Sequence, residues 1–297
     1  MIGRAYPNAA LADLRLICDW NTALFVWDDQ CDEAQLGWQP ERLAARCEQF
    51  LHVLLSGAPG DPDDYEIRAF ADVAQRLHQR MPPSWVRRFV HTVQEYVEGT
   101  LWEAHNRAHG VTPELGTYLR MRPLAGALFP YFEFADLSES IALPIEVRKH
   151  SAVARLSAMA ANVVVWSNDL FSLDKELRHQ DVHNLAVVLQ RERRLDLQAA
   201  IDQAAELHNA EVRSFIELER QLRPLPARAG QRAGYHERDA RPDAGRLSDA
   251  RPRRSRSSRC GQLSATPPER AAAARPAAPP QPSAARRSEH ASCGPDR

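Results

Sequence analysis

Side chains with oxygen donors recur at every fourth position in the segment 168–176. If this segment is helical, Asn168, Ser172 and Glu176 lie one above another, because residues i, i+4 and i+8 share a helix face. Three oxygen-bearing side chains on one stripe suit a hard cation such as Mg²⁺, which prefers oxygen ligands and usually shares its shell with phosphate and water. The pattern therefore predicts a helix that holds a metal ion beside a phosphate.

A second acidic cluster lies far upstream of this stripe. Asp28, Asp29, Asp32 and Glu33 fall within six positions, and Asp28 and Asp32 are again four residues apart. Two such stripes that face each other across a pocket between helices would hold several metal ions around a diphosphate.

The two clusters together carry a resemblance to a known family. Asp28-Asp29-x-x-Asp32 and Asn168-Asp169-x-x-Ser172-x-x-Lys175-Glu176 resemble the two metal-binding motifs of class I terpene synthases, especially the bacterial sesquiterpene cyclases. The second motif is the more specific, since it fixes polar residue types at four or five positions at helical spacing. The resemblance covers residues 3–221.

Two further segments agree with this resemblance. Tyr118-x-x-x-Arg122 lies 46 residues before Asn168, which is similar to where the family keeps its diphosphate-sensing arginine. The segment 180–185, which follows the second motif, also resembles the family. The family likeness implies an all-α helical bundle, the class I terpenoid synthase fold, with its active site between facing helices.

The resemblance implies a terpene cyclase, a carbon–oxygen lyase. Its substrate would be a linear isoprenyl diphosphate, with farnesyl diphosphate the expected chain length and a sesquiterpene the product. The ligands of three Mg²⁺ ions would come from Asp28, Asp29, Asp32, Asn168, Ser172 and Glu176. Arg122 would clamp the diphosphate through its planar fork of donors, and Lys175 would add a phosphate contact.

Ionisation of such a substrate leaves an allylic cation in an apolar pocket, where aromatic faces can stabilise it. The aromatic candidates are the rings close in sequence to the motifs, namely Phe25, Trp27, Phe129, Phe132 and Trp166. In the family, a helix break after the sensor arginine carries a linker and an effector residue. By position these are Ala125 and Gly126, and Pro123 supplies a physical reason for the break.

Composition supports a helical chain up to residue 221, because glycine is scarce and Ala, Leu, Glu and Arg are common. Periodicity and breakers predict the helices 10–29, 40–56, 64–80, 83–109, 113–122, 144–176 and 196–220. We expect Pro123 to end the helix that carries Arg122.

The segment 222–297 differs in kind from the rest. It holds 16 of the 38 basic residues, 7 of the 39 acidic ones and 11 of the 21 prolines, and it lacks Val, Ile, Phe, Met and Trp. Such a composition predicts disorder, because little apolar surface is available to offset chain entropy. A frameshifted reading, a genuine disordered tail and a basic arm all remain open. We divide the chain into a partial catalytic domain, 1–221, and this tail.

Two observations suggest that the catalytic domain is incomplete. Family members normally continue with further helices and an Arg-Tyr pair that contacts diphosphate, and 222–297 contains no such pair. The start at 3–7 also resembles a point well inside typical members. An inactive, truncated remnant of a cyclase is therefore an alternative to an active enzyme.

Other features bound the location and partners. The five cysteines have no metal-binding spacing, which favours a reducing cytoplasm, and residues 1–7 lack the apolar region of a signal peptide. The longest mainly apolar stretch, 158–166, is too short to span a membrane. We expect a monomer or homodimer that binds no nucleic acid.

Two other enzyme classes share single features with this chain. A head-to-tail isoprenyl diphosphate synthase carries two aspartate-rich motifs, whereas the second motif here begins with Asn168 and continues with Ser172. The segment 61–64 matches the Asp-x-Asp-Asp pattern of class II cyclases. It lies in a turn before a helix, where Asp is a common N-cap, whereas a general acid needs a buried site that raises its pKa.

Overall fold

The computed structural model describes residues 1–32, 35–61, 63–141 and 143–222. These residues form helices and contain no strand, which confirms the predicted all-α fold. The elements are α1 (Ile2–Ala5), α2 (Leu11–Asp32), the 3₁₀ turn η1 (Gln35–Trp38), α3 (Pro40–Ser56), α4 (Tyr65–Arg80), α5 (Pro83–His109), α6 (Leu115–Ala125), α7 (Leu128–Glu139), α8 (Ile145–Arg148), α9 (Ser151–Arg178), α10 (Leu185–Arg193) and α11 (Leu197–Leu222). The predicted tail lies outside the described residues, except that Leu222 still belongs to α11.

Local sequence signals set several helix ends. Pro40 and Pro83 occupy the first turns of α3 and α5, where a missing N–H has no intrahelical partner to lose. Gly57 and Gly110 end these two helices in the left-handed conformation, which glycine adopts without a Cβ penalty. Asp64 caps α4 by accepting a hydrogen bond from the Ile67 N–H at 3.1 Å. The proline and glycine signals explain why α3 and α5 were predicted with their observed bounds.

An aromatic core joins the first helices. Trp20 of α2 contacts Phe89 of α5 with ring centroids 4.9 Å apart, and Trp85 stacks on Phe89 at 5.2 Å. Further rings of this cluster are Trp27, Phe50, Phe70 and Phe134. Burial of each large ring stabilises the fold by about 1.5–3 kcal/mol relative to a ring exposed to water. This cluster therefore packs α2, α3, α4, α5 and α7 together as one unit.

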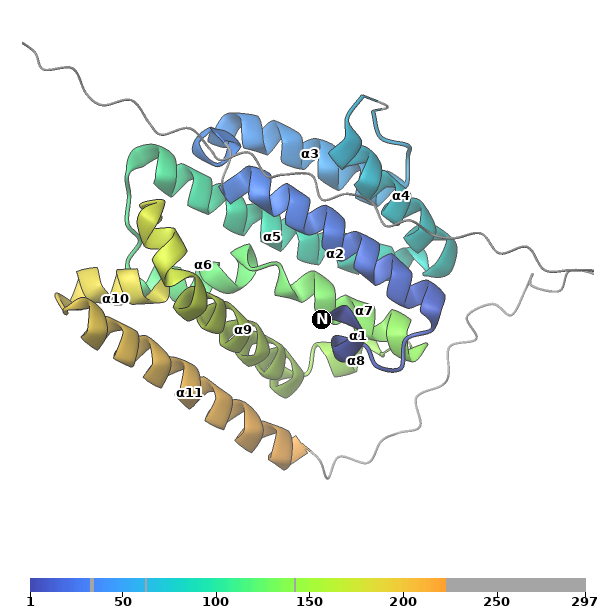
Figure 1. Cartoon of the computed structure of the whole chain (residues 1–297). Helices are drawn as coiled ribbons and strands as arrows, with labels where there is room; N and C mark the ends of the chain where they lie inside the picture. Colours follow the sequence, from blue (N-terminus) through green and yellow to red (C-terminus); the bar gives the residue numbers. More distant parts are fainter. Residues whose placement is uncertain (33–34, 62, 142, 223–297) are drawn as a thin grey trace, which may run out of the picture. The chain divides into compact units, whose positions relative to one another are not determined.

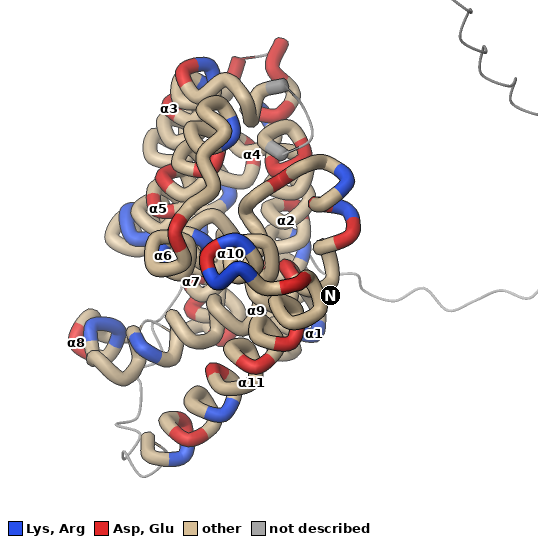
Figure 2. Tube along the Cα trace, turned by 90° about the vertical axis from the view of Figure 1, so that its left-hand side faces the viewer, with Lys and Arg blue, Asp and Glu red and all other residues tan. Residues whose placement is uncertain are grey.

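A second core lies among α6, α9, α10 and α11. Leu185 and Leu189 of α10 are fully buried, as are Ala200 and Ala204 of α11. The small alanine side chains let α11 approach its neighbours closely. Charged residues of both signs follow one another along α11 (Figure 2), as expected of a helix with a solvated outer side.

The two cores meet through α6 and α7, which both contact α5 and α9 (Figure 1). Helices α5 and α6 approach each other closely at Gly99 of α5. A Cβ atom at this position would lie less than 3.0 Å from the backbone of Ala125 at the end of α6. None of the described helices combines the length and the apolar character that crossing a membrane requires. The close contact at Gly99 fixes the position of α6, which carries Arg122.

Two predictions of helix bounds were wrong, and two helices were missed. Pro123 does not end its helix: α6 continues to Ala125, because the Gly126 N–H still reaches the Arg122 carbonyl at 3.0 Å, and the break falls at Ala127, whose φ is +56°. The predicted helix 144–176 is two helices, α8 and α9, with His150 as the N-cap of the second. The helices α7 and α10 were not predicted; α10 is only nine residues long.

Candidate functional site

The predicted oxygen stripe lies on α9 as its spacing requires. Asn168 is exposed, whereas Ser172 and Glu176 are partly buried. The Ser172 hydroxyl lies 2.6 Å from Glu176 Oε1 and 2.7 Å from the Asn168 carbonyl oxygen. Ser172 and Glu176 are therefore in contact, and Asn168 shares their helix face by its spacing.

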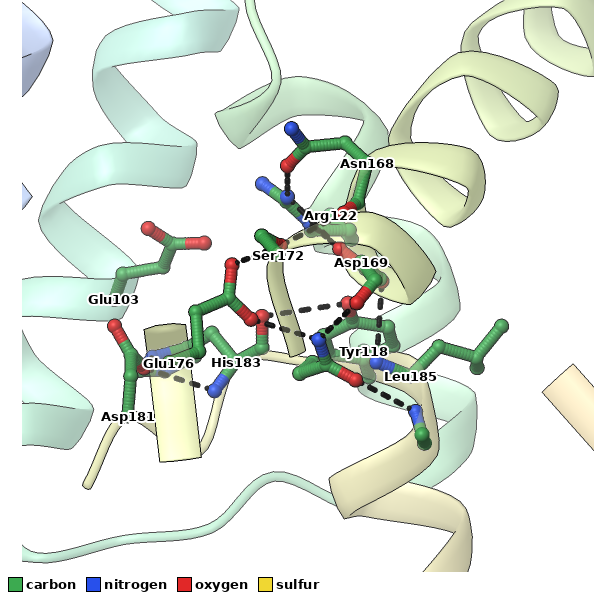
Figure 3. Close-up of polar contacts among 12 residues, drawn as sticks. Glu103, Tyr118, Arg122, Asn168, Asp169, Ser172, Glu176, Asp181, His183 and Leu185 are labelled. Atoms are coloured by element: carbon green, nitrogen blue, oxygen red, sulfur yellow. Dashed lines mark hydrogen bonds and ion pairs between the residues drawn. The ribbon is translucent and has the colours of Figure 1, made fainter. Parts of the chain in front are cut away.

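Arg122 approaches this stripe from α6. Its Nη2 donates to Asn168 Oδ1 at 3.0 Å, and its Nε donates to Asp169 Oδ1 at 2.9 Å (Figure 3). Burial disfavours its charge, but the nearby Asp169 carboxylate outweighs this and raises the pKa of Arg122 well above its ordinary value. The structure thus places the predicted sensor arginine directly beside the second motif.

Asp169 lies beneath the stripe and is fully buried. Its second oxygen, Oδ2, accepts a hydrogen bond from the Leu185 N–H at 3.1 Å and another from the Tyr118 hydroxyl. Burial and the charge of Asp169 raise the pKa of Tyr118 well above its ordinary value, so the hydroxyl keeps its proton and remains a donor. Sequence analysis gave Asp169 and Tyr118 no role, although both belong to the quoted motifs.

Glu176 is held from two sides. Ser172 contacts its Oε1, and the Asn184 amide donates to its Oε2 at 2.7 Å. Burial raises the pKa of Glu176, and the hydrogen bonds from Ser172 and Asn184 oppose this rise. Asn184 was part of the quoted segment 180–185 but was assigned no role; its position directly before the apolar run of α10 is the signal of an N-cap.

The turn between α9 and α10 is fixed to α5. Asp181 Oδ2 accepts from Arg107 Nη2 at 2.9 Å, and its Oδ1 lies 2.8 Å from His183 Nδ1. His183 Nε2 lies 3.1 Å from the Asn106 amide nitrogen, which fits the tautomer with its proton on Nδ1. Although burial opposes ionisation, the His183 hydrogen bond and the Arg107 charge lower the pKa of Asp181.

The first acidic motif lies at the end of α2. Asp28 is partly buried and accepts a hydrogen bond from the Tyr96 hydroxyl of α5 at 3.1 Å, whereas Asp29 is exposed. Asp32 is the last residue of α2, and its side chain lies outside what the structure describes. Its predicted role as a ligand stays a prediction.

Helix α5 relates the two motifs. Tyr96, which contacts Asp28, and Glu103, whose charge acts on Arg122, are seven residues apart and share one face of α5. Two helical turns separate them by about 10 Å along the axis. Asp28 and Arg122 therefore both border the same face of α5, about two turns apart.

The predicted aromatic residues of α2 lie on different faces. Phe25 is 54% exposed and shares the face of Asp28, three residues on. Trp27 is fully buried against Phe50, with ring centroids 5.1 Å apart, and Arg46 lies over its ring. The structure therefore places Trp27 in the aromatic core, on the opposite side of α2 from Phe25. The predicted pocket role of Trp27 stays a prediction.

The remaining pocket candidates come from α7, α9 and the break after α6. Phe129 and Phe132 are partly buried on α7 and meet edge to face at 5.9 Å. Trp166 is buried in the second core, on the helix that carries the stripe. At Gly126, a Cβ atom would overlap the Val165 side chain of α9, so a larger residue there would require Val165 to shift. Lys175, in contrast, lies exposed on α9. Ala125, the other predicted residue of the break, is buried.

The donor set of α9 fits a hard cation. Octahedral Mg²⁺ with oxygens at about 2.1 Å separates neighbouring ligand atoms by about 3 Å, close to the 2.6 Å between Ser172 Oγ and Glu176 Oε1. Within the described ranges, no group of three His, Cys, Asp or Glu side chains is able to hold a metal ion. The α9 stripe is not a group of this kind, because two of its three oxygen donors are the Asn168 amide and the Ser172 hydroxyl.

The class II pattern at 61–64 has a structural role at its last residue. Asp64 caps α4 and forms an ion pair with Arg46. Burial opposes the ionisation of Asp64, but the hydrogen bond and charge of Arg46 lower its pKa. A general acid needs the opposite shift, so this geometry argues against class II chemistry.

Comparison with known proteins agrees with the geometry. Residues 19–214 match the family described as terpene synthase family 2, C-terminal metal binding. The chain is 40% identical over 216 residues to (+)-T-muurolol synthase from Roseiflexus castenholzii, a match that covers 73% of this chain and 66% of that protein. It is 33% identical over 218 residues to germacrene A synthase from Nostoc punctiforme, covering 73% and 68%.

A solved structure supports the fold. Germacradien-4-ol synthase from Streptomyces citricolor superposes with a TM-score of 0.65 at 26% identity, over 73% of this chain and 69% of that one. The chain spans about two thirds of the length of the curated relatives it matches. The matched segment includes both acidic motifs, Arg122 and the turn at 181–184. The chain belongs to terpene synthase family 2, whose members are class I terpene synthases.

Proposed function

We propose that this protein ionises and cyclises farnesyl diphosphate in a Mg²⁺-dependent reaction that releases inorganic diphosphate and a sesquiterpene. The observation that carries the proposal is the oxygen stripe of α9, which lies within hydrogen-bonding distance of a buried, permanently charged arginine. Oxygen ligands and a guanidinium side by side are what a metal–diphosphate group requires.

In this proposal, Asn168, Ser172 and Glu176 bind metal on α9, and Asp28, Asp29 and Asp32 bind it at the end of α2. Three bound Mg²⁺ ions would neutralise the charge that develops on the departing oxygen. Arg122 has donors already directed at the stripe, and its high pKa keeps it cationic. It would exchange its contact with Asn168 for a phosphate oxygen, and Lys175 would add a second cation.

The carbon–oxygen bond breaks heterolytically, and both electrons leave with the diphosphate. The remaining allylic cation closes a ring by attack of a distal double bond and then loses a proton or captures water. Phe25, on the face of Asp28, and Phe129 and Phe132 on α7 are the rings that we propose for cation stabilisation. Ala125 and Gly126, at the end of α6 and just before the break at Ala127, are the positions that we propose for the linker and the effector residue.

The relatives support the choice of substrate. The synthase from Roseiflexus castenholzii is named for the cyclisation of farnesyl diphosphate, and the synthase from Nostoc punctiforme is named for germacrene A. The geometry supports the proposal of a metal ion and a diphosphate but does not address chain length. The C15 chain length comes to this protein from those names.

The test is to incubate the full chain with MgCl₂ and farnesyl diphosphate and to analyse the organic extract by gas chromatography with mass detection. We expect a C15 hydrocarbon or alcohol whose formation stops when EDTA is added. Geranyl diphosphate and geranylgeranyl diphosphate are incubated in parallel, to determine which substrate chain length the protein accepts. A folded, helical protein that releases no diphosphate from any of the three substrates would refute the proposal.

A further inference from the structure

Asn184 is fully buried, and all of its hydrogen-bonding groups have partners. Its amide nitrogen donates to Glu176 Oε2 at 2.7 Å and to the Asp169 carbonyl oxygen at 2.6 Å, while its Oδ1 accepts from the Ala186 N–H at 2.9 Å. Only one orientation of the amide satisfies all three contacts, since the reverse would set oxygen against two oxygens and N–H against N–H. The side chain is therefore locked.

This lock fixes the orientation of the Glu176 carboxylate relative to the α9 stripe. Asn184 holds Oε2, so the carboxylate is turned with Oε1 toward Ser172, at 2.6 Å. A carboxylate held only by Ser172 would be free to rotate about its last torsion, because a terminal sp² group has a broad torsional preference. Preorganisation of a ligand by a group behind it commonly changes metal affinity.

We propose that Asn184 is a positioning residue for the metal ligand Glu176, and that its second task, capping α10, ties the orientation of that ligand to the turn at 181–184. The inference rests on the proposed metal–diphosphate site. Asn184 contacts no substrate atom in this scheme and acts only through Glu176. The ion pair between Asp181 and Arg107 anchors this turn to α5. The proposed ligand Glu176 is therefore held by α9, α10 and α5.

The two tasks of Asn184 can be separated by substitution. Asn184→Ser keeps an N-cap acceptor, because Ser and Asn cap helices about equally well, but its short hydroxyl gives up the amide hydrogen bonds to Glu176 and to the Asp169 carbonyl oxygen. Asn184→Asp also keeps the cap and places a second negative charge beside Glu176. Asp196→Ala is the matched control, since Asp196 caps α11 by accepting from the Ala199 N–H at 2.8 Å and is exposed.

The readout is binding, measured without turnover. The melting temperature of the full chain is followed while MgCl₂ is added at a fixed concentration of inorganic diphosphate, and the MgCl₂ concentration at half of the maximal rise is recorded. We expect this midpoint to increase by about 10–100-fold for Asn184→Ser, and further for Asn184→Asp. Asp196→Ala should lower the melting temperature at zero MgCl₂ and leave the midpoint unchanged.

Turnover gives a second, independent readout. With farnesyl diphosphate, Asn184→Ser should be impaired at low MgCl₂ and recover at saturating MgCl₂, because the ligand set is intact. If the midpoints of Asn184→Ser and wild type coincide, Asn184 is only a helix cap and the inference is wrong while the proposed function stands. If wild type itself shows no rise with MgCl₂ and diphosphate, the proposed metal–diphosphate site has failed first.

Discussion

Replacement of Asp169 by asparagine tests whether the buried charge beneath the α9 stripe holds this half of the fold together. The carboxylate is fully buried and opposes Arg122, whose side chain is only 12% exposed. Its two oxygens serve different donors: Oδ1 accepts from Arg122, and Oδ2 accepts from Tyr118 and the Leu185 N–H. An amide has one oxygen, so either orientation of the substituted side chain sets its NH₂ group against a donor, and the guanidinium loses its nearest countercharge.

The expected cost follows from this geometry. Breaking a buried ion pair by removing one partner costs about 3–5 kcal/mol, because an uncompensated charge stays in a medium of low dielectric constant. For a folded unit of this size, about 2–4 °C is lost per kcal/mol, so Asp169→Asn should lower the melting temperature by about 6–20 °C. Thermal unfolding followed by circular dichroism measures the shift.

Helix α9 supplies a matched control for this experiment. Asp174 pairs with Arg178 on the same helix, but its side chain is 83% exposed, and exposed pairs contribute little to stability. Asp174→Asn therefore makes the same chemical change without the burial. A shift for Asp169→Asn that is no larger than the shift for Asp174→Asn would refute the reasoning, since burial would then add nothing to the pair.

Three further predictions follow from the same geometry. Gly99→Ala should lower the melting temperature, because overlap with the Ala125 backbone, at about 1–3 kcal/mol or more, outweighs the gain of about 1 kcal/mol in helix propensity; a higher melting temperature would contradict the close approach. Asp181→Asn should cost about 1–3 kcal/mol near pH 7, through its contacts with Arg107. Since folding lowers the pKa of Asp181, this stability is present above its unfolded value of about 3.9 and is lost as the pH falls below it, so the melting temperatures of variant and wild type should converge in acid. Glu176→Gln should reduce kcat/KM for farnesyl diphosphate by more than about 100-fold, a larger loss than the one expected when a residue that only orients a metal ligand is replaced. Equal kcat/KM for variant and wild type would show that Glu176 does not bind metal.

Much of the fold could be predicted because its signals are local. The bounds of α3 and α5 follow from Pro40, Pro83, Gly57 and Gly110, each of which acts through its own backbone. Pro123 was misjudged because its effect depends on its neighbours. Its ring removes one N–H, but a helix hydrogen bond survives on the next turn, and the chain does not turn until Ala127.

The site was predictable to the extent that its residues share one helix. Asn168, Ser172 and Glu176 are placed by spacing alone, and the family resemblance pointed to Arg122. Trp27 was placed by its proximity in sequence to Asp28, which ignores helical direction: one residue along a helix is a rotation of about 100°, enough to turn the ring into the aromatic core. Contacts between elements, such as the one between Asn184 and Glu176, have no signature at a fixed spacing.

The same contacts that stabilise the second core also fix the ligands of the proposed site. Asp169 neutralises Arg122 from below while Asn168 contacts it from above, so the arginine is held in place before any anion arrives. Such preorganisation lowers the cost of ordering a long side chain when a diphosphate binds. The arrangement sets a buried carboxylate between the proposed metal ligand Asn168 and the proposed sensor Arg122, and Asp169 supplies the nearest countercharge of the guanidinium. Stability and diphosphate binding should therefore respond together to changes at Asp169, whereas a change at Asn184 that keeps its cap should weaken metal binding in addition to any stability lost with its two buried hydrogen bonds.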